Sequence, residues 1–216
     1  MNTLFTFVRH GETDANRNGI LQGQKEYPLN SAGIAQAEAV AEYLQDREFD
    51  VIYSSDLSRA AVTAQKIMDT GHKNVPLILT AQLRELDCGD LSGWNYTDLR
   101  EKYPEKMDFF YRESGSGAFP GGESKIGFQV RIDEFLQDVL NKHRGKKILL
   151  ISHGGVLMRI FRSVAGIGGA HTLLPLAGNA SVNEFQYSEK FQSWQLTQWN
   201  FREHLKNIPQ HQTLVL

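Results

Sequence analysis

Short apolar runs alternate along the chain with segments in which apolar residues recur every three or four positions. The runs predict buried strands and the spaced segments predict amphipathic helices. The predicted strands cover residues 3–8, 50–53, 75–79, 146–152, 181–187 and 193–199. The predicted helices cover 31–44 with a cap at Asn30 or Ser31, then the stretch from a 54–56 cap to about 68, then 154 to about 164. This alternation favours an α/β fold, a three-layer sandwich with a mostly parallel central sheet flanked by helices.

The pattern loosens between residues 88 and 125, where glycines gather around the aromatic group Phe109, Phe110 and Tyr111. Glycine-rich loops with packed aromatics often cover a site on an α/β scaffold. We therefore expect a single domain over 1–216 with a small inserted lid at about 88–125. The alternative is a surface excursion with a small core of its own.

The last two predicted strands carry Trp194 and Trp199. Packing against the sheet is the favoured interpretation, and a dimer surface is the alternative. The sequence leaves a homodimer open. Residues 210–216 are expected to be a loose tail.

Charge and composition narrow the range of partners. The chain has 216 residues, with 23 Lys and Arg against 25 Asp and Glu, a formal charge of −2. This balance gives no support for nucleic acid or an anionic membrane as a partner. Cys88 is the single cysteine, which excludes an intramolecular disulfide and a cysteine-based zinc cluster. The first residues are too short an apolar run for a signal peptide and no run approaches a membrane span, so a cytoplasmic protein is expected.

Polar residues follow three of the predicted strands, in the segments 9–13, 55–59 and 152–155. Because the carboxyl ends of parallel strands meet at one edge of a sheet, His10 and His153 are expected to converge there with Arg9 and Arg59. Guanidiniums match phosphate oxygens, and the start of the helix at Gly154 offers backbone N–H groups to the same anion. Each residue alone has an ordinary structural interpretation. Together they predict a local pocket for a small phosphorylated substrate.

Several longer segments carry a family resemblance. They are LFTFVRHGETDAN at 4–16, GQKEYPLNSAG at 23–33, YSSDLSRA at 53–60, LRELDCGDLSG at 83–93, PGGES at 120–124 and ISHGG at 151–155. In this order and approximate spacing the set resembles the histidine phosphatase superfamily, also called the phosphoglycerate mutase-like family. The RHG triplet alone is weakly specific, whereas the ordered set covers about residues 3 to 165.

The resemblance implies a phosphohistidine mechanism in which His10 is the nucleophile. An imidazole suits this role because its ordinary pKa of about 6.5 leaves much of it neutral at pH 7. One ring nitrogen must then be held by a hydrogen-bond acceptor. Arg9, Arg59 and His153 would surround the transferring phosphoryl group.

The remaining implied roles concern hydrogen bonding and the proton. Asn16 and Gln22 would donate hydrogen bonds to the phosphoryl oxygens or to the ester. Glu85 aligns with the family's general acid, which would protonate the leaving alcohol and then activate water. Glu12 is the competing acid, because it lies closer to His10 in sequence.

Departures from the mutases favour the phosphatase branch. Mutases of the family are longer and have a lysine where this chain has Tyr96, so a likely second anion contact is lost. We expect a metal-independent phosphomonoesterase, with a phosphoglycerate mutase or a catalytically silent phosphate-binding module as alternatives. Sugar phosphates, nucleotides, a cobalamin-precursor phosphate and phosphoproteins stay open as substrates.

No cofactor or metal is expected. The spacing of His10 and Glu12 matches the H-x-E motif of zinc deaminases, but the P-C-x-x-C that this motif requires is absent. The chain has no GxxxxGK[ST] loop and no GxGxxG after a strand.

Overall fold

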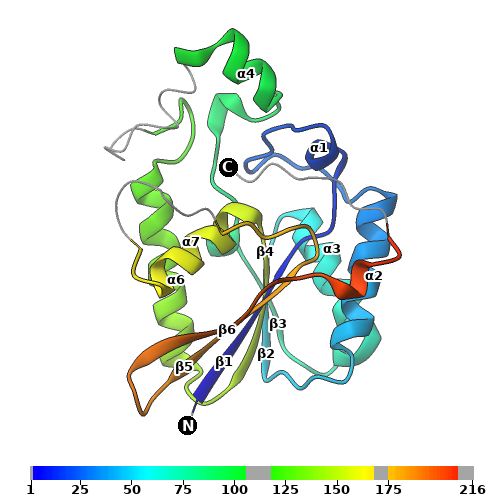
Figure 1. Cartoon of the computed structure of the whole chain (residues 1–216), viewed down its shortest axis with the longest axis vertical. Helices are drawn as coiled ribbons and strands as arrows, with labels where there is room; N and C mark the ends of the chain where they lie inside the picture. The colour runs from blue at the N-terminus through cyan, green and yellow to red at the C-terminus, as the bar shows by residue number, and fades with distance from the viewer. Residues whose placement is uncertain (1, 106–117, 168–174, 209–216) are drawn as a thin grey trace.

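A six-stranded sheet forms the centre of the protein in the computed structural model, which describes residues 2–105, 118–167 and 175–208 (Figure 1). The strands are β1 Asn2–Arg9, β2 Val51–Ser55, β3 Leu77–Thr80, β4 Lys147–Ser152, β5 Val182–Ser188 and β6 Ser193–Phe201. Their order in the sheet is β3-β2-β4-β1-β5-β6. Neighbouring strands from β3 to β1 pair in parallel, and β5 is antiparallel to both β1 and β6. The sheet is therefore mostly parallel, as the sequence predicts.

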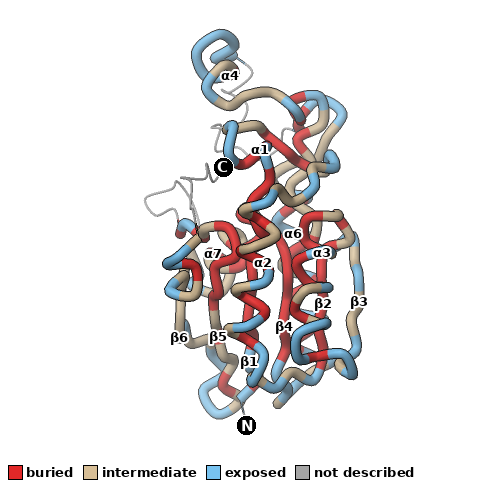
Figure 2. Tube along the Cα trace, turned by 90° about the vertical axis from the view of Figure 1, so that its right-hand side faces the viewer, coloured by how far each residue is buried: buried red, intermediate tan, exposed pale blue. Residues whose placement is uncertain are grey.

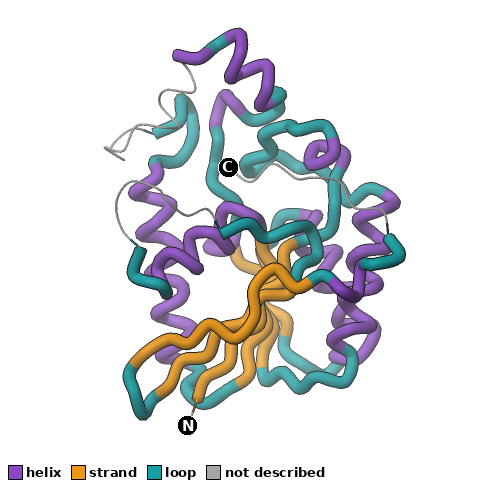
Figure 3. Tube along the Cα trace, in the orientation of Figure 1, coloured by secondary structure: helices purple, strands orange, loops and turns teal. Residues whose placement is uncertain are grey.

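Helices cover both faces of this sheet (Figure 3). The α-helices with described residues are α1 Asp14–Arg17, α2 Ser31–Leu44, α3 Ser58–Ile67, α4 Tyr96–Lys102, α6 Lys125–Lys142 and α7 Gly154–Val164. Short turns of other helix types lie at Met68–His72, Ala81–Leu83, Gly89–Leu91 and Glu203–Leu205.

Two hydrophobic clusters fill the space between the three layers. Side chains alternate across a strand, so Ile148 and Leu150 of β4 face one cluster while Leu149 and Ile151 face the other. The first cluster packs against α6 and α7, and the second packs against α2 and α3. All four β4 side chains are buried, in the red centre of Figure 2. The expected three-layer α/β sandwich is confirmed.

The helix ends show where the sequence signals were correct and where they were wrong. Helix α2 has the expected bounds, and the Asn30 side chain caps it by accepting a hydrogen bond of 2.8 Å from the Gly33 N–H. The expected cap of α3 at residues 54–56 is wrong. Ser54 and Ser55 continue β2, where they pair with β4 and β3, and Leu57 precedes the helix with no side-chain cap.

Helix α6 is an element that the sequence pattern left unassigned. Its buried residues recur at three- and four-residue steps, namely Phe128, Ile132, Phe135, Leu136, Val139 and Leu140. Ser124 caps its first turn by accepting a 2.9 Å hydrogen bond from the Gly127 N–H. The periodic signal of an amphipathic helix was therefore present in the sequence.

A third hydrophobic cluster joins α4 to the loops that precede and follow it. Its buried members are Leu21, Cys88, Leu91, Leu99 and Phe119, and Trp94 and Tyr96 pack against it. The described part of the 88–125 segment thus has a core of its own. Phe109, Phe110 and Tyr111 lie outside the described residues.

The late strand pair packs its tryptophans onto the sheet. The Trp194 ring lies 5.2 Å from Phe5 of β1, and the Trp199 ring lies 5.9 Å from Phe185 of β5, measured between centroids. These contacts agree with the favoured packing interpretation. The tail at 210–216 lies outside the described residues. Within the described ranges, no helix combines the length and the apolar character needed to cross a membrane.

Candidate active site

The ends of β1, β2 and β4 bring the predicted site residues to one edge of the sheet. Arg9 pairs with Ser152 in the β1–β4 register, so His10 and His153 leave the sheet at the same level. Their ring centroids are 5.1 Å apart. Arg59 comes from the first turn of α3, directly after β2, and it is buried with Arg9 and both histidines. The expected convergence is found.

The His10 ring is held in a single orientation by its own loop. Its Nδ1 lies 2.6 Å from the Gly11 carbonyl oxygen, which can only accept, so Nδ1 carries the proton. Burial, followed by the charges of Arg59 and Arg9, lowers the pKa of His10 well below its ordinary value. The imidazole is therefore neutral at pH 7, with its lone pair on Nε2. This is the nitrogen that a nucleophile requires.

The Arg59 guanidinium is oriented by three acceptors. Nη1 donates to the Lys25 carbonyl at 3.0 Å, Nη2 donates to the Gly23 carbonyl at 2.8 Å, and Nε donates to His153 Nδ1 at 3.3 Å. Gly23 has a φ of +53°, and an added Cβ there would lie 2.6 Å from Ser92 Oγ. A glycine is needed at this turn because the loop passes so close to its neighbour.

His153 orients other groups through both ring nitrogens. Because Nδ1 accepts from Arg59, Nε2 carries the proton and donates to Ser55 Oγ at 2.8 Å. Burial, with Arg59 and then His10 adding to it, lowers the pKa of His153 well below its ordinary value. The ring thus stays neutral and fixes Arg59 beside His10. Because both ring nitrogens are bonded to the protein here, the phosphoryl contact that the family resemblance implies for His153 stays a prediction.

Arg9 lies against the start of α7. Its Nη1 donates to the Ala177 carbonyl at 2.6 Å, and its Nε is buried with no acceptor among the described residues. Burial lowers its pKa to about 10, so the guanidinium stays charged at pH 7. A Cβ on Gly154 would lie 3.1 Å from the Arg9 Cζ, which makes glycine at 154 a condition of this close approach. An unpaired buried N–H on a cation suits an oxyanion ligand.

The side-chain amides of Asn16 and Gln22 lie on the α1 side of the site. Thr13 Oγ1 lies 3.1 Å from Asn16 Oδ1 and 3.0 Å from Gln22 Oε1, and Asn179 Nδ2 donates to the same Asn16 oxygen at 3.1 Å. Because the oxygen ends of both amides are bonded to the protein, their NH₂ ends are the groups left to donate to a ligand.

The two competing carboxylates have different surroundings. Glu85 accepts hydrogen bonds of 2.9 Å from both the Leu86 and the Gly155 N–H groups, and its charge opposes the burial that lowers the pKa of Arg9 and Arg59. Glu12 instead accepts a 2.9 Å hydrogen bond from the Asn30 side chain, at the start of α2. The geometry favours Glu85 as the proton donor.

Asn179 is a site residue that the sequence did not reveal. This buried side chain donates to the His10 carbonyl at 3.0 Å and to the Gly11 carbonyl at 3.2 Å, besides Asn16. It therefore orients the carbonyl that holds the His10 proton. The following residue, Ala180, has a φ of +51° and its N–H reaches the Arg9 carbonyl at 3.0 Å. No local motif marks Asn179, because its partners lie more than 160 residues away in sequence.

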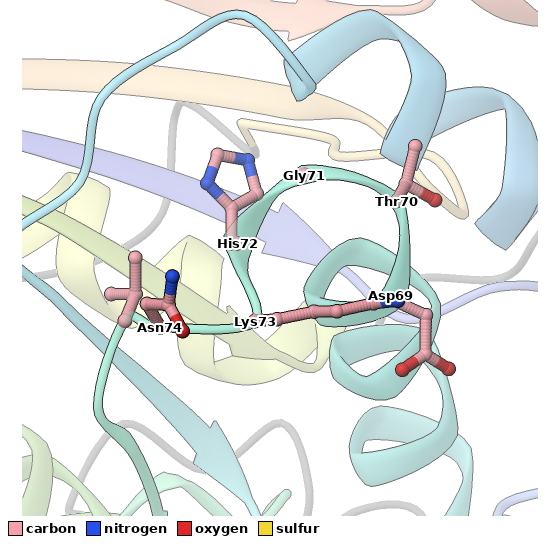
Figure 4. Close-up of a pocket in the computed structure, with 7 residues that line it drawn as sticks. Asp69, Thr70, Gly71, His72, Lys73 and Asn74 are labelled. Carbon is pink, nitrogen blue, oxygen red and sulfur yellow. The ribbon is translucent and has the colours of Figure 1, made fainter.

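A separate surface hollow of about 330 Å³ is lined by residues 69–75 at the end of α3 (Figure 4). His72 is its one imidazole; the ring Nε2 lies 3.1 Å from the Leu44 carbonyl, and the ring packs on Phe49. These contacts are structural, and the hollow contains none of the predicted site residues. Across the described part of the chain, no cluster of three or more His, Cys, Asp or Glu side chains is placed to hold a metal ion.

A neutral buried imidazole beside two buried guanidiniums, with a carboxylate on the same rim, defines a site for phosphoryl transfer on an α/β sandwich. The family comparison agrees: the model of the histidine phosphatase superfamily (branch 1) matches residues 5–202. The chain belongs to this superfamily. The expected enzyme class, a phosphoric monoester hydrolase, is confirmed with it.

Characterised relatives include both phosphatases and mutases. The chain is 36% identical to a metal-independent phosphoserine phosphatase of Arabidopsis thaliana over 208 residues, 95% of this chain and 84% of the relative. It is 33% identical to a 2,3-bisphosphoglycerate-dependent phosphoglycerate mutase of Mesorhizobium japonicum, over 78% of this chain and 84% of the relative. A crystal structure of an Entamoeba histolytica phosphoserine phosphatase in complex with phosphoserine is similar with a TM-score of 0.78 and 27% identity, over 94% of this chain and 99% of that one.

Proposed function

We propose that this protein hydrolyses small phosphate monoesters of aliphatic alcohols, such as phosphoserine, through a phosphohistidine on His10. The observation that carries the proposal is the His10 ring, whose Nδ1 proton is bonded to the Gly11 carbonyl and whose pKa is lowered by burial and two guanidiniums. The phosphoserine phosphatase relatives support an amino acid phosphate as the substrate.

In the first step the Nε2 lone pair of His10 attacks phosphorus, and the bond from phosphorus to the ester oxygen breaks. Arg9 and Arg59 stabilise the charge on the phosphoryl oxygens, and the NH₂ groups of Asn16 and Gln22 donate to them. The start of α7 at Gly154 contributes further positive potential. The carboxyl proton of Glu85 passes to the leaving alkoxide.

In the second step the Glu85 carboxylate takes a proton from water as the water oxygen attacks phosphorus. The bond from phosphorus to Nε2 breaks, which restores neutral His10 and releases inorganic phosphate. Glu85 ends protonated, ready for the next ester. The overall reaction is one ester and one water giving one alcohol and one phosphate.

We also propose that the chain forms one domain, in which the segment 88–125 covers the pocket. The two described ends of that segment contact each other: the Asp90 N–H donates to the Pro120 carbonyl at 2.8 Å, and a Cβ on Gly89 would overlap that same oxygen. Trp94 packs edge-on to Tyr103 within it. A cover joined at both ends would exclude water from the first step.

The test is phosphate release from a panel of monoesters, including phosphoserine and phosphoglycerates, with a chelator present. His10→Ala should abolish turnover while the protein stays folded, and the wild-type protein should form an acid-labile, base-stable phosphoprotein that the variant does not. His143→Ala is the matched control, because His143 bonds Tyr53 away from the pocket. Turnover by folded His10→Ala would overturn the mechanism. Isomerisation of phosphoglycerate without phosphate release would instead identify a mutase, and binding without turnover would identify a silent module.

A further inference from the structure

A bidentate ion pair contacts the backbone of the segment that carries Glu85. Arg131 of α6 donates from Nε to Glu123 Oε1 at 2.9 Å and from Nη2 to Glu123 Oε2 at 2.8 Å. Both side chains are about four-fifths buried, with 19% and 18% of their surface exposed. Glu123 belongs to the PGGES segment, for which the proposed reaction assigns no role.

The pair bonds the backbone of the segment that carries Glu85. Arg131 Nη1 donates to the carbonyls of Gln82 at 2.7 Å and Arg84 at 3.0 Å, and Nη2 lies 3.5 Å from the Glu85 carbonyl. On the other side of Glu85, the Glu123 N–H donates to the Asp87 carbonyl at 3.0 Å. The Glu123 carboxylate also accepts a 3.4 Å hydrogen bond from the Asp87 N–H, so the guanidinium and the carboxylate together bond the backbone before, at and after Glu85.

The Glu85 carboxylate has a separate set of contacts, to the Leu86 and Gly155 N–H groups. Those contacts fix the direction of the side chain, whereas the ion pair fixes the backbone from which it extends. A proton donor has to be held within hydrogen-bond distance of the leaving oxygen to be effective.

We infer that Arg131 and Glu123 are positioning residues that set the place of the Glu85 carboxyl for proton transfer. This inference rests on the proposed role of Glu85 as general acid. It also gives the PGGES segment a role, because Glu123 of this segment then links α6 to the backbone that carries the proton donor.

The experiment compares two esters by kcat/KM, an alkyl ester with a poor leaving group and an aryl ester with a good one. kcat/KM depends only on the steps up to release of the alcohol, so the rate of phosphohistidine hydrolysis does not affect this comparison. General acid catalysis contributes typically about 10²- to 10⁴-fold, and it matters most for the poor leaving group. Glu85→Gln should therefore lower the alkyl value by about 100-fold or more and the aryl value by less than about 10-fold.

Arg131→Ala should reproduce the same selectivity at smaller size, with a loss of about 10-fold on the alkyl ester and less than about 3-fold on the aryl ester. Arg131→Lys keeps the charge but loses the two-pronged geometry, so it should recover only part of the alkyl activity. Added guanidinium should restore the alkyl ester selectively in Arg131→Ala. In a Glu85→Gln background, Arg131→Ala should add no further selectivity, because the group that it positions is already gone.

A matched control comes from another ion pair on the same helix. Arg159 of α7 pairs with Asp133 of α6 at 2.7 Å, away from the backbone that carries Glu85, so Arg159→Ala should affect both esters equally. If Arg131→Ala does not fold, Glu123→Gln removes the ion pair while keeping its shape and should show the same selectivity. Equal losses on both esters in the Arg131 and Glu123 variants, with Glu85→Gln still selective, would overturn the inference alone. A Glu85→Gln variant without selectivity would overturn the proposed role of Glu85 and this inference with it.

Discussion

Replacing Gly155 by alanine should separate activity from stability at this site. Gly155 is the second residue of α7, and an ideal Cβ there would lie 2.3 Å from Glu85 Oε1. Ordinary contact begins at 3.4 Å, so the carboxyl has to move. It can do so at little cost to the fold because it is the end of a flexible side chain.

The movement needed is about 1 Å, and a misplacement of that size can cost a catalytic step about 100-fold. We therefore expect kcat/KM for an alkyl phosphate to fall by about 30- to 100-fold in Gly155→Ala. The free energy of unfolding should change by less than about 1 kcal/mol, because the helix propensity of alanine offsets the weakening of the hydrogen bonds that Glu85 accepts from Leu86 and Gly155.

The assay pairs phosphate release with chemical denaturation of the same preparation. Gly127→Ala is the matched control, since it makes the same change in the first turn of α6. Its added Cβ would lie 3.0 Å from the Ser124 hydroxyl that caps this helix, so it disturbs a helix start away from the site, and kcat/KM should stay within about twofold of wild type whatever happens to stability. A Gly155→Ala protein that hydrolyses the alkyl ester within about twofold of wild type would refute the placement of Glu85. So would a loss of activity that tracks a loss of stability.

Two further predictions concern the nucleophile and its support. His10 and His153 should stay neutral at pH 6, so their ring protons should show no NMR titration near pH 6.5; an inflection there would contradict their burial. Because the native pKa values lie below the unfolded value of about 6.5, only the unfolded state gains these protons as the pH falls. The contribution of the two neutral imidazoles to the free energy of unfolding is thus fully present above about pH 6.5. It decreases below that pH, by at most about 1.4 kcal/mol per pH unit for each imidazole. Asn179→Ala removes one donor from the Gly11 carbonyl and one from the Asn16 oxygen, each of which keeps another, and should cost about 0.5–1.5 kcal/mol in denaturant unfolding. It should also slow phosphorylation of His10 in a single turnover, and an unchanged rate would restrict Asn179 to stability.

The parts of the fold predictable from sequence are those with a local signal. The bounds of α2 follow from its spacing and from the Asn30 cap. The site edge follows from a general rule, that polar residues after parallel strands gather at one end of a sheet. Each rule needs only the residues next to the end of one helix or one strand, and each predicts the structure correctly.

Helix α6 was left unassigned although its periodic signal is local, and the other errors come from contacts that join distant segments. Ser54 and Ser55 have the composition of a helix cap, yet pairing with Ile151 and Thr80 on the neighbouring strands keeps them in β2. Asn179 bonds His10 across 169 residues, and Arg131 bonds Gln82 across 49. A single asparagine or arginine has no sequence signal for such a partner, so the supporting groups of a site are harder to predict than the groups that react.

The way in which the two site guanidiniums are held explains how the pocket can attract an anion in a chain of net charge −2. Arg9 and Arg59 bond to backbone carbonyls and an imidazole, which orient the cations without cancelling their charge. Arg131, by contrast, forms a bidentate ion pair with the Glu123 carboxylate, which balances the charge of its guanidinium. Glu85 acts on both cations through its charge, but neither forms an ion pair with it among the described residues. Because a buried charge is weakly screened, an incoming phosphoryl group gains more from these two side chains than it would at the surface.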